Sequence, residues 1–314
     1  MIQEKIVEEA NNLFEQPWWL DIVAEGEWDE VRVEENGKVI GRFPFCYNEK
    51  KKTISLPTLT QTCGIWIAES SKTVLNDVLS EKKKIIDGIL EQLPKSKNIK
   101  IALDSSVDYF LPFLWKGFSV IPRVSYRIED LSDIDKIYGG FSKTVKKNIK
   151  SAQKKVQISD KTDVEVLLSI MDKTFEAQGR KYPVSKEIIR KIVQKCDESG
   201  NGKMLTAIDE SGNVHACSYF VYDENVFYYL IAGSDSEYRS SGAQTLILWE
   251  GIKYATKVSK KFDFEGSMIE GIETFFRRFG GTPTVYYEIR KQTFLAQIME
   301  VLKPRIKKLL GYKM

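Results

Sequence analysis

Histidine is almost missing from this sequence, since His215 is the single one among 314 residues. Metal sites built from several histidines are therefore excluded, and any Ser–His–Asp or Cys–His arrangement would have to use this one residue. His215 lies in the stretch 214–222, which has the apolar pattern of a strand just after a turn. We expect it to be an ordinary strand residue, and we expect no metal site.

Closely spaced cysteines, long apolar runs and a large net charge are missing too. The four cysteines have no CxxC spacing, so neither a disulfide framework nor a zinc knuckle is expected. No run approaches the roughly 18 apolar residues of a membrane helix. The first thirty residues carry acids where a signal peptide would be basic and then apolar, which predicts a cytoplasmic protein. With 47 basic against 44 acidic residues, any attraction for phosphate has to come from local clustering.

The apolar pattern predicts a mixed α/β protein with two domains, 1–130 and 131–314. In the first half, strand-like stretches precede an amphipathic helix and a further strand: 30–33, 39–47 and 53–56, then 80–93 and 99–103. The second half begins with three predicted helices, 142–155, 163–179 and 185–199, and continues with three strands, 204–208, 214–222 and 226–232. After these strands, helices and strands alternate: a helix at 241–258, a strand at 261–264, a helix at 269–279 and a strand at 284–290. An antiparallel meander that feeds a β–α–β crossover implies a mixed sheet.

The loop after the strand 226–232 has the composition of an anion site. Small residues in the first turn of the next helix expose backbone N–H groups, which together with the helix dipole attract an anion. Arg239 adds a fixed positive charge beside them. The pattern fits a pyrophosphate, although an ordinary serine-capped helix after a strand would look similar. The residues that we expect to bind it are Gly233, Ser234, Arg239, Ser241, Gly242 and Ala243.

A basic stretch precedes the strands of the second half. Residues 136–155 contain seven lysines and no acid, whereas a solvated helix normally mixes both signs. A surface of one sign favours an anionic ligand such as a nucleotide sugar or a tRNA. A merely soluble helix face is the alternative.

The order of meander, strand, Arg-x-x-Gly-Ala loop, helix, strand and helix resembles the acyl-coenzyme A binding core of GNAT-type N-acyltransferases. The phosphate loop of that family reads Gln/Arg-x-x-Gly-x-Gly/Ala, and Arg239, Gly242 and Gln244 stand at its places, so the last small residue is replaced. The resemblance implies acyl-coenzyme A as the co-substrate.

A second resemblance, to the FemAB-like branch, extends over nearly the whole chain. This branch has two GNAT-like domains in one chain and includes ligases that build peptidoglycan bridges. The matching segments are, in order, FEQPWWL at 14–20, LPTLT at 56–60, FSKTVKKNIKSA at 141–152, GR at 179–180, FDFEGS at 262–267 and FFRRFGG at 275–281. The long helical hairpin that some Fem ligases insert is absent from the sequence. The resemblance implies two tandem GNAT-like domains, with aminoacyl-tRNA as an alternative donor.

Two carboxylates and an arginine are candidates for the chemistry. Asp263 and Glu265 flank Phe264 on a predicted strand, so both would face one side, where one could act as general base. Capping or ion pairing at a strand end is the alternative. Arg277 follows Phe276 where the Fem ligases have Phe-Lys, so the resemblance implies that it stabilises the oxyanion. An exposed helix cation is the alternative for Arg277.

The resemblance also implies an acceptor site. Arg180, in the loop Gly-Arg-Lys-Tyr-Pro, matches the family position that contacts the acceptor's phosphate, and arginine suits bidentate phosphate binding. Together with the basic stretch, this predicts a small-molecule or nucleotide-linked acceptor held by Lys143, Lys146, Lys147, Arg180 and Tyr182.

The leading functional hypothesis is an N-acyltransferase that moves an acyl group from acyl-coenzyme A to an amine of an amino sugar or cell-envelope precursor by direct attack. The alternatives are an aminoacyl-tRNA-dependent transferase of FemAB type acting on a peptidoglycan precursor, and a non-catalytic binding protein. The basic C-terminal segment 294–314 predicts a surface helix, for which peripheral membrane contact is a further possibility.

Overall fold

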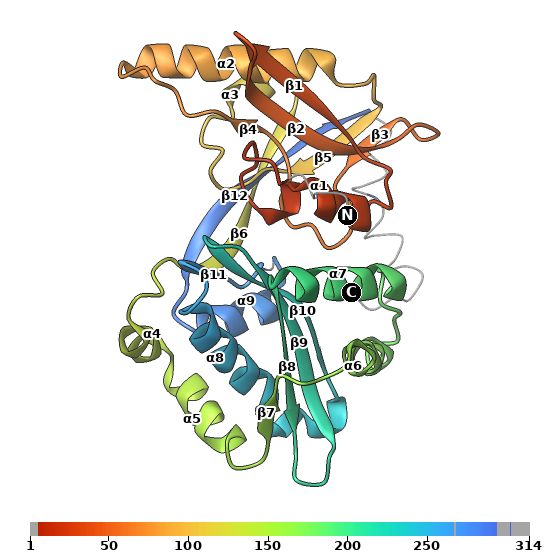
Figure 1. Ribbon diagram of the computed structural model, residues 1–314, viewed down its shortest axis with the longest axis vertical. Coiled ribbons are helices and arrows are strands. Elements are labelled where there is room, and N and C mark those ends of the chain that lie inside the picture. Colours follow the sequence, from red (N-terminus) through yellow and green to blue (C-terminus); the bar gives the residue numbers. More distant parts are fainter. Residues whose placement is uncertain (1–5, 267, 294–301, 303–314) are drawn as a thin grey trace. The chain divides into compact units, whose positions relative to one another are not determined.

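The computed structural model describes residues 6–266, 268–293 and 302, and the chain divides into two compact units (Figure 1). The first unit comprises Met1–Arg123 and the described part of Tyr286–Met314, and the second comprises Val124–Val285. The second unit therefore begins before residue 130 and ends well before residue 314. The physical reason is long-range pairing, because Glu288–Gln292 of the last strand pair antiparallel with a strand of the first unit.

The first unit is built on a mixed sheet in the order β1-β2-β3-β5-β12, with β4 paired to β2. Its strands are β1 (Asp29–Glu35), β2 (Lys38–Asn48), β3 (Thr53–Ser55), β4 (Trp66–Ile67), β5 (Asn98–Ala102) and the second part of β12 (Thr282–Gln292). The strand β3 runs parallel to β5, whereas β1, β2 and β3 form the expected antiparallel meander.

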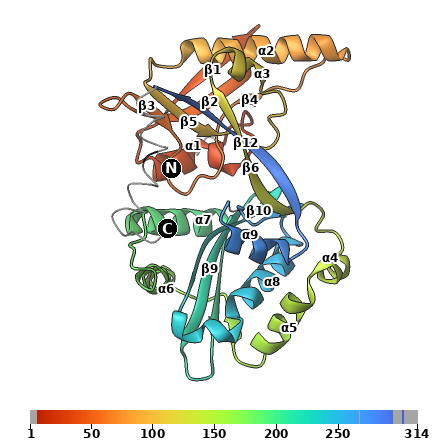
Figure 2. The same ribbon diagram turned by 180° about the vertical axis from the view of Figure 1, so that it is seen from behind.

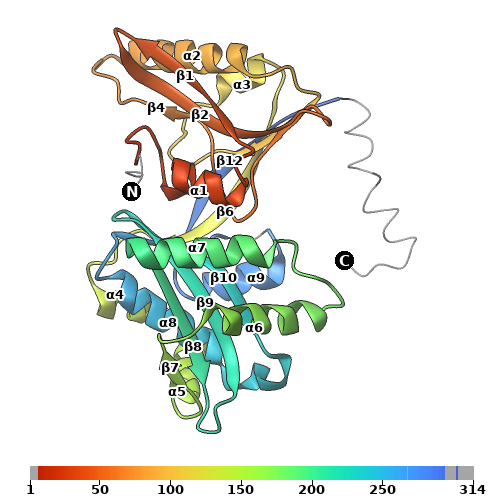
Figure 3. The ribbon, with the colours of Figure 1, turned by 45° about the vertical axis from the view of Figure 1, so that its right-hand side comes forward.

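Successive side chains of β2 point to opposite faces of this sheet, and a different helix covers each face. Gly41 leaves room for Ile85 and Ile89 of helix α2 (Leu75–Gln92), which packs across β1 and β2. Its neighbour Arg42 is fully buried on the other face, where Nη1 donates to the carbonyl of Glu15, 2.9 Å away. Figure 3 shows α2 and α1 (Pro17–Val23) on the two sides of these strands. The remaining helices of the unit are η1 (Leu13–Glu15) and α3 (Leu111–Trp115).

The second unit has the strand order β6-β11-β10-β9-β8-β7. The pair β10–β11 is parallel and the other pairs are antiparallel, as a meander followed by a crossover predicts. The strands are β6 (Ser119–Ile128), β7 (Gln157–Ser159), β8 (Gly202–Ile208), β9 (Val214–Tyr222), β10 (Val226–Ser234) and β11 (Lys261–Asp263).

Helices cover both faces of this second sheet (Figure 2). Helix α6 contacts β9 and β10 and helix α7 contacts β8, where Tyr219 of β9 donates to the carbonyl of Val193. Helix α8 packs on the opposite face, where Gly251 lies against the ring of Phe220. The helices are α4 (Ile134–Gly140), α5 (Lys143–Ala152), α6 (Val164–Glu176), α7 (Lys186–Ser199), η2 (Ser236–Ser241), α8 (Ala243–Ala255) and α9 (Glu270–Arg277).

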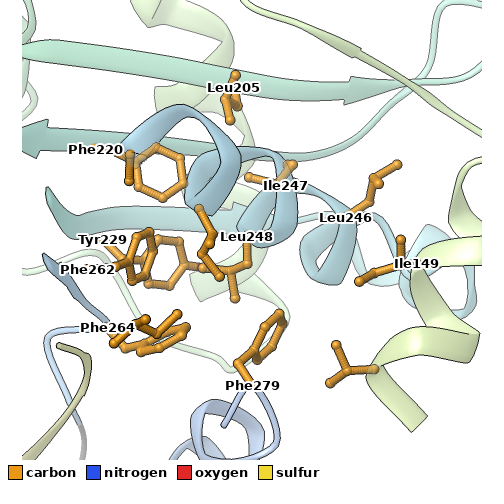
Figure 4. Close-up of a cluster of buried hydrophobic side chains, with 14 of the residues drawn as sticks. Ile149, Leu205, Phe220, Tyr229, Leu246, Ile247, Leu248, Phe262, Phe264 and Phe279 are labelled. Carbon is orange, nitrogen blue, oxygen red and sulfur yellow. The ribbon is translucent and has the colours of Figure 1, made fainter. Parts of the chain in front are cut away.

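Aromatic rings form much of the core between α8 and the sheet. Figure 4 shows Phe220 and Tyr229 from the strands beside Phe262, Phe264 and Phe279, with leucine and isoleucine side chains of α8 against them. The ring centroids of Phe262 and Phe264 are 4.8 Å apart, in an edge-to-face arrangement. This packing fixes β10, β11 and the start of α8 relative to one another within the unit.

Candidate functional site

Strands β10 and β11 pair over three residues only and then separate. The parallel register runs from Val226–Lys261 to Tyr228–Asp263, after which β11 ends while β10 continues to Ser234. On its other side β10 stays paired with β9 up to Ser234, with a register shift between Tyr229 and Ile231. In the described chain, no strand therefore pairs with the β11 side of β10 beyond Tyr228.

A pocket of about 560 Å³ lies where β10 leads into α8, and we call it the α8 pocket. Helix α5 contributes Asn148, β9 contributes His215, and α9 contributes Gly271, Ile272 and Phe275. Most of the predicted anion loop lines this pocket: Ser234, Arg239, Ser241, Gly242 and Ala243. Gly233 does not, because an added Cβ would point at Ile170 of α6, 2.9–3.0 Å from its atoms, on the other face of the sheet.

Gly242 is required at the start of α8 for two reasons. Its φ of +79° lies in the left-handed region, and an added Cβ would come within 3.2 Å of the Asn148 carbonyl. As the N-cap residue, Gly242 offers no side chain to the helix, and within the described chain Ser241 Oγ is the one side-chain acceptor for the first turn, 3.2 Å from the Ala243 N–H. The N–H groups of Thr245 and Leu246 donate to the Gly242 carbonyl, so the Gln244 N–H is the first-turn donor left for a ligand in the described chain. Together with Arg239 it suits an anionic group.

Gln244 stands where the family loop has a small residue, and its side chain forms hydrogen bonds with residues of β9 and β10. Its Nε2 donates to Ser218 Oγ at 2.8 Å and to Tyr229 Oη at 2.6 Å. These bonds draw the amide toward the sheet and away from the first-turn N–H groups. The substitution therefore anchors α8 to β9 and β10.

His215 is the functional candidate that sequence reasoning missed. It lies on strand β9 as expected, but its side chain borders the α8 pocket and stacks on Tyr238, with centroids 4.0 Å apart and planes 6° from parallel. Its Nε2 lies 3.1 Å from Asp209 Oδ2. No local pattern could have indicated this, because Tyr238 belongs to η2 and reaches β9 only in the folded chain.

The basic stretch lies beside the α8 pocket. Its lysines are divided between two helices rather than one, because α4 ends at Gly140 and Ser142 caps α5 through a bond to the Val145 N–H. Lys155, just after α5, donates to the carbonyl of Ser240 at 3.2 Å. Lys143 and Lys147 are exposed, and Lys146 Nζ donates to the Gly139 carbonyl at 2.8 Å.

Arg180 and Tyr182 line a different pocket, of about 330 Å³, between α6 and α7, which we call the α6–α7 pocket. The ring of Tyr182 meets Phe175 edge-on, with centroids 4.9 Å apart. The predicted acceptor residues are therefore not brought together, since Lys143, Lys146 and Lys147 belong to α5 and do not line this pocket.

Asp263 and Glu265 occupy different environments, and the prediction that one strand carries both is wrong. Strand β11 ends at Asp263, and Glu265 has a φ of +57°, a left-handed conformation that is uncommon for a residue other than glycine. Asp263 is fully buried and accepts bonds from Ser125 Oγ, from Arg127 Nε at 2.5 Å and from the Glu265 N–H at 2.7 Å. These bonds occupy both of its carboxylate oxygens.

The carboxyl group of Glu265 differs from that of Asp263 in its pKa. Burial raises its pKa well above the usual range, and the charge of Asp263 acts in the same direction while Arg127 opposes it. Glu265 also lies within electrostatic range of the α6–α7 pocket, because burial first and then the charge of Glu265 raise the pKa of Tyr182 to about 12. The left-handed backbone and the perturbed carboxyl make Glu265 a candidate for a functional residue.

Arg277 ends α9 with its side chain 61% exposed and ion-paired to Glu273 Oε1 at 3.2 Å. It lines neither the α8 pocket nor the α6–α7 pocket. The exposed ion pair agrees with the alternative given above for this residue, a surface helix cation, and its oxyanion role stays a prediction.

Other sequence expectations concern cysteines, metals and membranes. Burial raises the pKa of Cys46 and Cys217 to about 11 and that of Cys196 to about 12, so these thiols are protonated at neutral pH. Over 6–266 and 268–293, no group of three or more metal-ligating side chains gathers, and no described helix is both long and apolar enough to cross a bilayer. The C-terminal segment considered for membrane contact lies outside the described residues, apart from Leu302.

Comparison with known proteins identifies the fold. A family model described as an acetyltransferase (GNAT) domain matches residues 140–277, whereas no curated protein sequence matches the chain. The structure of FemX superposes with a TM-score of 0.63 at 15% identity, covering 93% of this chain and 95% of FemX.

Two further structures share this arrangement. A domain assigned to a lysylphosphatidylglycerol synthetase from Agrobacterium fabrum gives a TM-score of 0.58 at 8% identity, with 90% of each chain covered. A tandem GNAT protein from the clavulanic acid biosynthesis pathway gives 0.51 at 10% identity, with 87% of this chain and 93% of that chain covered. With its mixed sheets, its matched acetyltransferase domain and these neighbours, the chain has a tandem GNAT fold similar to that of FemX, as its sequence predicts.

Proposed function

We propose that this protein is an N-acyltransferase that takes an acyl group from acyl-coenzyme A at the α8 pocket and transfers it to an amine. The observation that carries the proposal is the α8 pocket itself, where the helix start at Gly242 and the side chain of Arg239 lie beside an edge of β10 that β11 leaves unpaired. Fold likeness supports an acyltransferase but does not select the donor or the acceptor.

The residues present fit coenzyme A at two separate points. A diphosphate suits the start of α8, where the Gln244 N–H remains as a donor, and the guanidinium of Arg239. A pantetheine arm carries amide groups, and the backbone of β10 from Tyr229 to Gly233, on the side that β11 leaves, can exchange hydrogen bonds with amides as a strand would. The two points adjoin, because Ser234, the last residue of β10, lines the α8 pocket.

The acceptor is assigned to the α6–α7 pocket, with an anionic group of the acceptor on Arg180. Glu265 is the general base of this proposal: its buried carboxyl lines neither pocket, but its charge acts on Tyr182 of the α6–α7 pocket. In the reaction the amine nitrogen bonds to the acyl carbon, its proton passes to the ionised Glu265, and the carbon–sulfur bond breaks to release coenzyme A as the thiolate, which then takes up a proton from solvent. No protein nucleophile is required, which suits a chain whose cysteines are protonated. Arg277 remains the proposed oxyanion stabiliser. In that role its side chain has to break the ion pair with Glu273.

Substitution of Arg239 and of Arg180 should weaken the binding of different substrates, because the two arginines line different pockets. Arg239→Ala removes a charged hydrogen-bond donor at the α8 pocket and should weaken coenzyme A binding by roughly 1.5 to 3 kcal/mol. Arg180→Ala should raise the acceptor KM and leave coenzyme A affinity nearly unchanged. Calorimetric titration of both variants with coenzyme A makes the comparison. Equal loss of coenzyme A affinity in both variants would place the arginines at one phosphate site and contradict the assignment.

A second candidate donor, aminoacyl-tRNA, is favoured by one observation. Helix α5 reaches the α8 pocket through Asn148 and carries the exposed lysines Lys143 and Lys147, so a backbone of many phosphates could continue from the pocket across α5.

Salt dependence separates the two donors. Binding of tRNA releases one counterion for nearly every neutralised phosphate, so its affinity should fall by roughly a thousandfold or more between 50 and 200 mM salt if six or more contacts form. Coenzyme A presents few phosphates and should lose much less. Titration of fluorescent tRNA and of coenzyme A over this salt range makes the comparison. Steep loss of a tight tRNA complex, with no measurable coenzyme A binding, would overturn acyl-coenzyme A in favour of the RNA donor.

A further inference from the structure

The stacked pair of His215 and Tyr238 forms one wall of the α8 pocket, and nothing in the proposed acyl transfer uses it. The ring of His215 lies flat on Tyr238, with centroids 4.0 Å apart and planes 6° from parallel. His215 is 6% exposed, so protein surrounds the rest of its ring, whereas Tyr238 is half-buried and borders the pocket. The histidine therefore backs one face of the tyrosine and leaves the edges and opposite face of that ring as its accessible surface.

The surrounding contacts hold this pair in a fixed place. Asp209 Oδ2 lies 3.1 Å from His215 Nε2 and accepts a hydrogen bond from it when that nitrogen carries the proton, and the Asp235 N–H donates to the His215 carbonyl at 3.0 Å. Asp235 in turn caps η2 through the Glu237 N–H and pairs with Lys173 Nζ at 2.6 Å. Because η2 carries both Tyr238 and Arg239, the aromatic surface and the cation keep a set spacing.

We propose that the His215–Tyr238 stack is a platform for the adenine base of the donor. Bases stack on aromatic side chains whatever their sequence context, and an adenosine with phosphates would place those phosphates on Arg239 and the start of α8. Asn148 lines the same pocket and has no side-chain hydrogen bond in the described part of the chain. An asparagine amide matches the N6 and N7 edge of adenine, so Asn148 can select this base.

The inference rests on the proposed function, since it names a part of the donor bound at the same pocket. Both candidate donors end in adenosine, in coenzyme A as the 3′-phosphorylated nucleotide and in tRNA as the terminal base. The shared chemistry is therefore an adenosine with attached phosphate.

The test is calorimetric titration with adenosine 3′,5′-bisphosphate, with 4′-phosphopantetheine and with a CCA trinucleotide. Tyr238→Leu keeps the apolar bulk but removes the ring, and should weaken adenosine bisphosphate binding roughly 5- to 150-fold, the usual range for one stacked base. Tyr238→Phe keeps the ring and should bind within about twofold of wild type, and it serves as the folding control. Phosphopantetheine affinity should be equal in all three proteins. Tighter binding of the trinucleotide than of the bisphosphate would assign the adenosine to RNA.

The outcomes separate this inference from the proposed function. If coenzyme A and phosphopantetheine bind but Tyr238→Leu binds adenosine bisphosphate as well as wild type does, the platform is wrong and the donor assignment stands. If none of the adenosine ligands nor phosphopantetheine binds, both ideas are overturned. For base selection, Asn148→Leu should reduce the preference for adenosine over guanosine 3′,5′-bisphosphate, and an unchanged preference would remove Asn148 from the inference.

Discussion

Glu265→Gln should lower kcat by roughly 100- to 10,000-fold, the range for loss of a positioned general base. The substitution preserves the shape of the side chain and removes the ability of the carboxylate to take the amine proton. Activity of the wild type should rise with pH through the raised pKa of Glu265, because only the ionised form accepts a proton. Rates measured over a pH series by thiol release make the comparison.

The same variant should be at least as stable as the wild type at pH 8. A carboxyl whose pKa is raised in the folded state costs stability as the pH rises above its unfolded value, and a neutral glutamine removes that cost. Glu250→Gln is the matched control, since Glu250 pairs with Lys253 on α8 and takes no part in the proposed chemistry. A Glu265→Gln enzyme with near-normal kcat would remove the base from the proposed mechanism.

Asp263→Asn should destabilise the protein by about 3 to 5 kcal/mol, although the sequence offers Asp263 and Glu265 as equivalent candidates. Asp263 is fully buried and Arg127 is 11% exposed, with Nε 2.5 Å from the carboxylate. Removing one partner of a buried ion pair leaves the other charge uncompensated, which accounts for the size of the effect. Chemical denaturation of purified variants gives the free energy of unfolding.

A double-variant cycle controls this prediction. Arg127→Met alone should also be strongly destabilising, whereas Arg127→Met with Asp263→Asn should cost clearly less than the sum of the two. At temperatures where Asp263→Asn stays folded, kcat should remain close to that of the wild type. Normal stability combined with a large loss of kcat would instead make Asp263 the catalytic carboxylate.

Local signals in the sequence predicted most elements of the second unit. Ser142, Asp163 and Ser185 are visible as N-caps before amphipathic stretches, and each side chain accepts a bond from the first turn of its helix. The turns between β8, β9 and β10 were equally readable from their Asp, Gly and Asn residues. The loop before α8 is predicted to be an anion site because its small residues and Arg239 are adjacent in the sequence.

Features that depend on distant parts of the chain could not be predicted in this way. Strand β12 belongs to the first unit because it pairs with β5, with Glu288 opposite Ala102. The apolar pattern of one strand does not show which other strand it will pair with. The left-handed backbone at Glu265 has no local signature, since the residue is not a glycine. The contact between His215 and Tyr238 likewise arises only when β9 and η2 meet.

A crystal structure of the protein soaked with acetyl-coenzyme A would show where the donor binds. We expect the diphosphate at the start of α8 and on Arg239, the pantetheine along β10 beyond Tyr228, and the acyl group directed toward Glu265. Coenzyme A bound in the α6–α7 pocket, or an α8 pocket that remains without ligand at saturating concentration, would contradict this expectation.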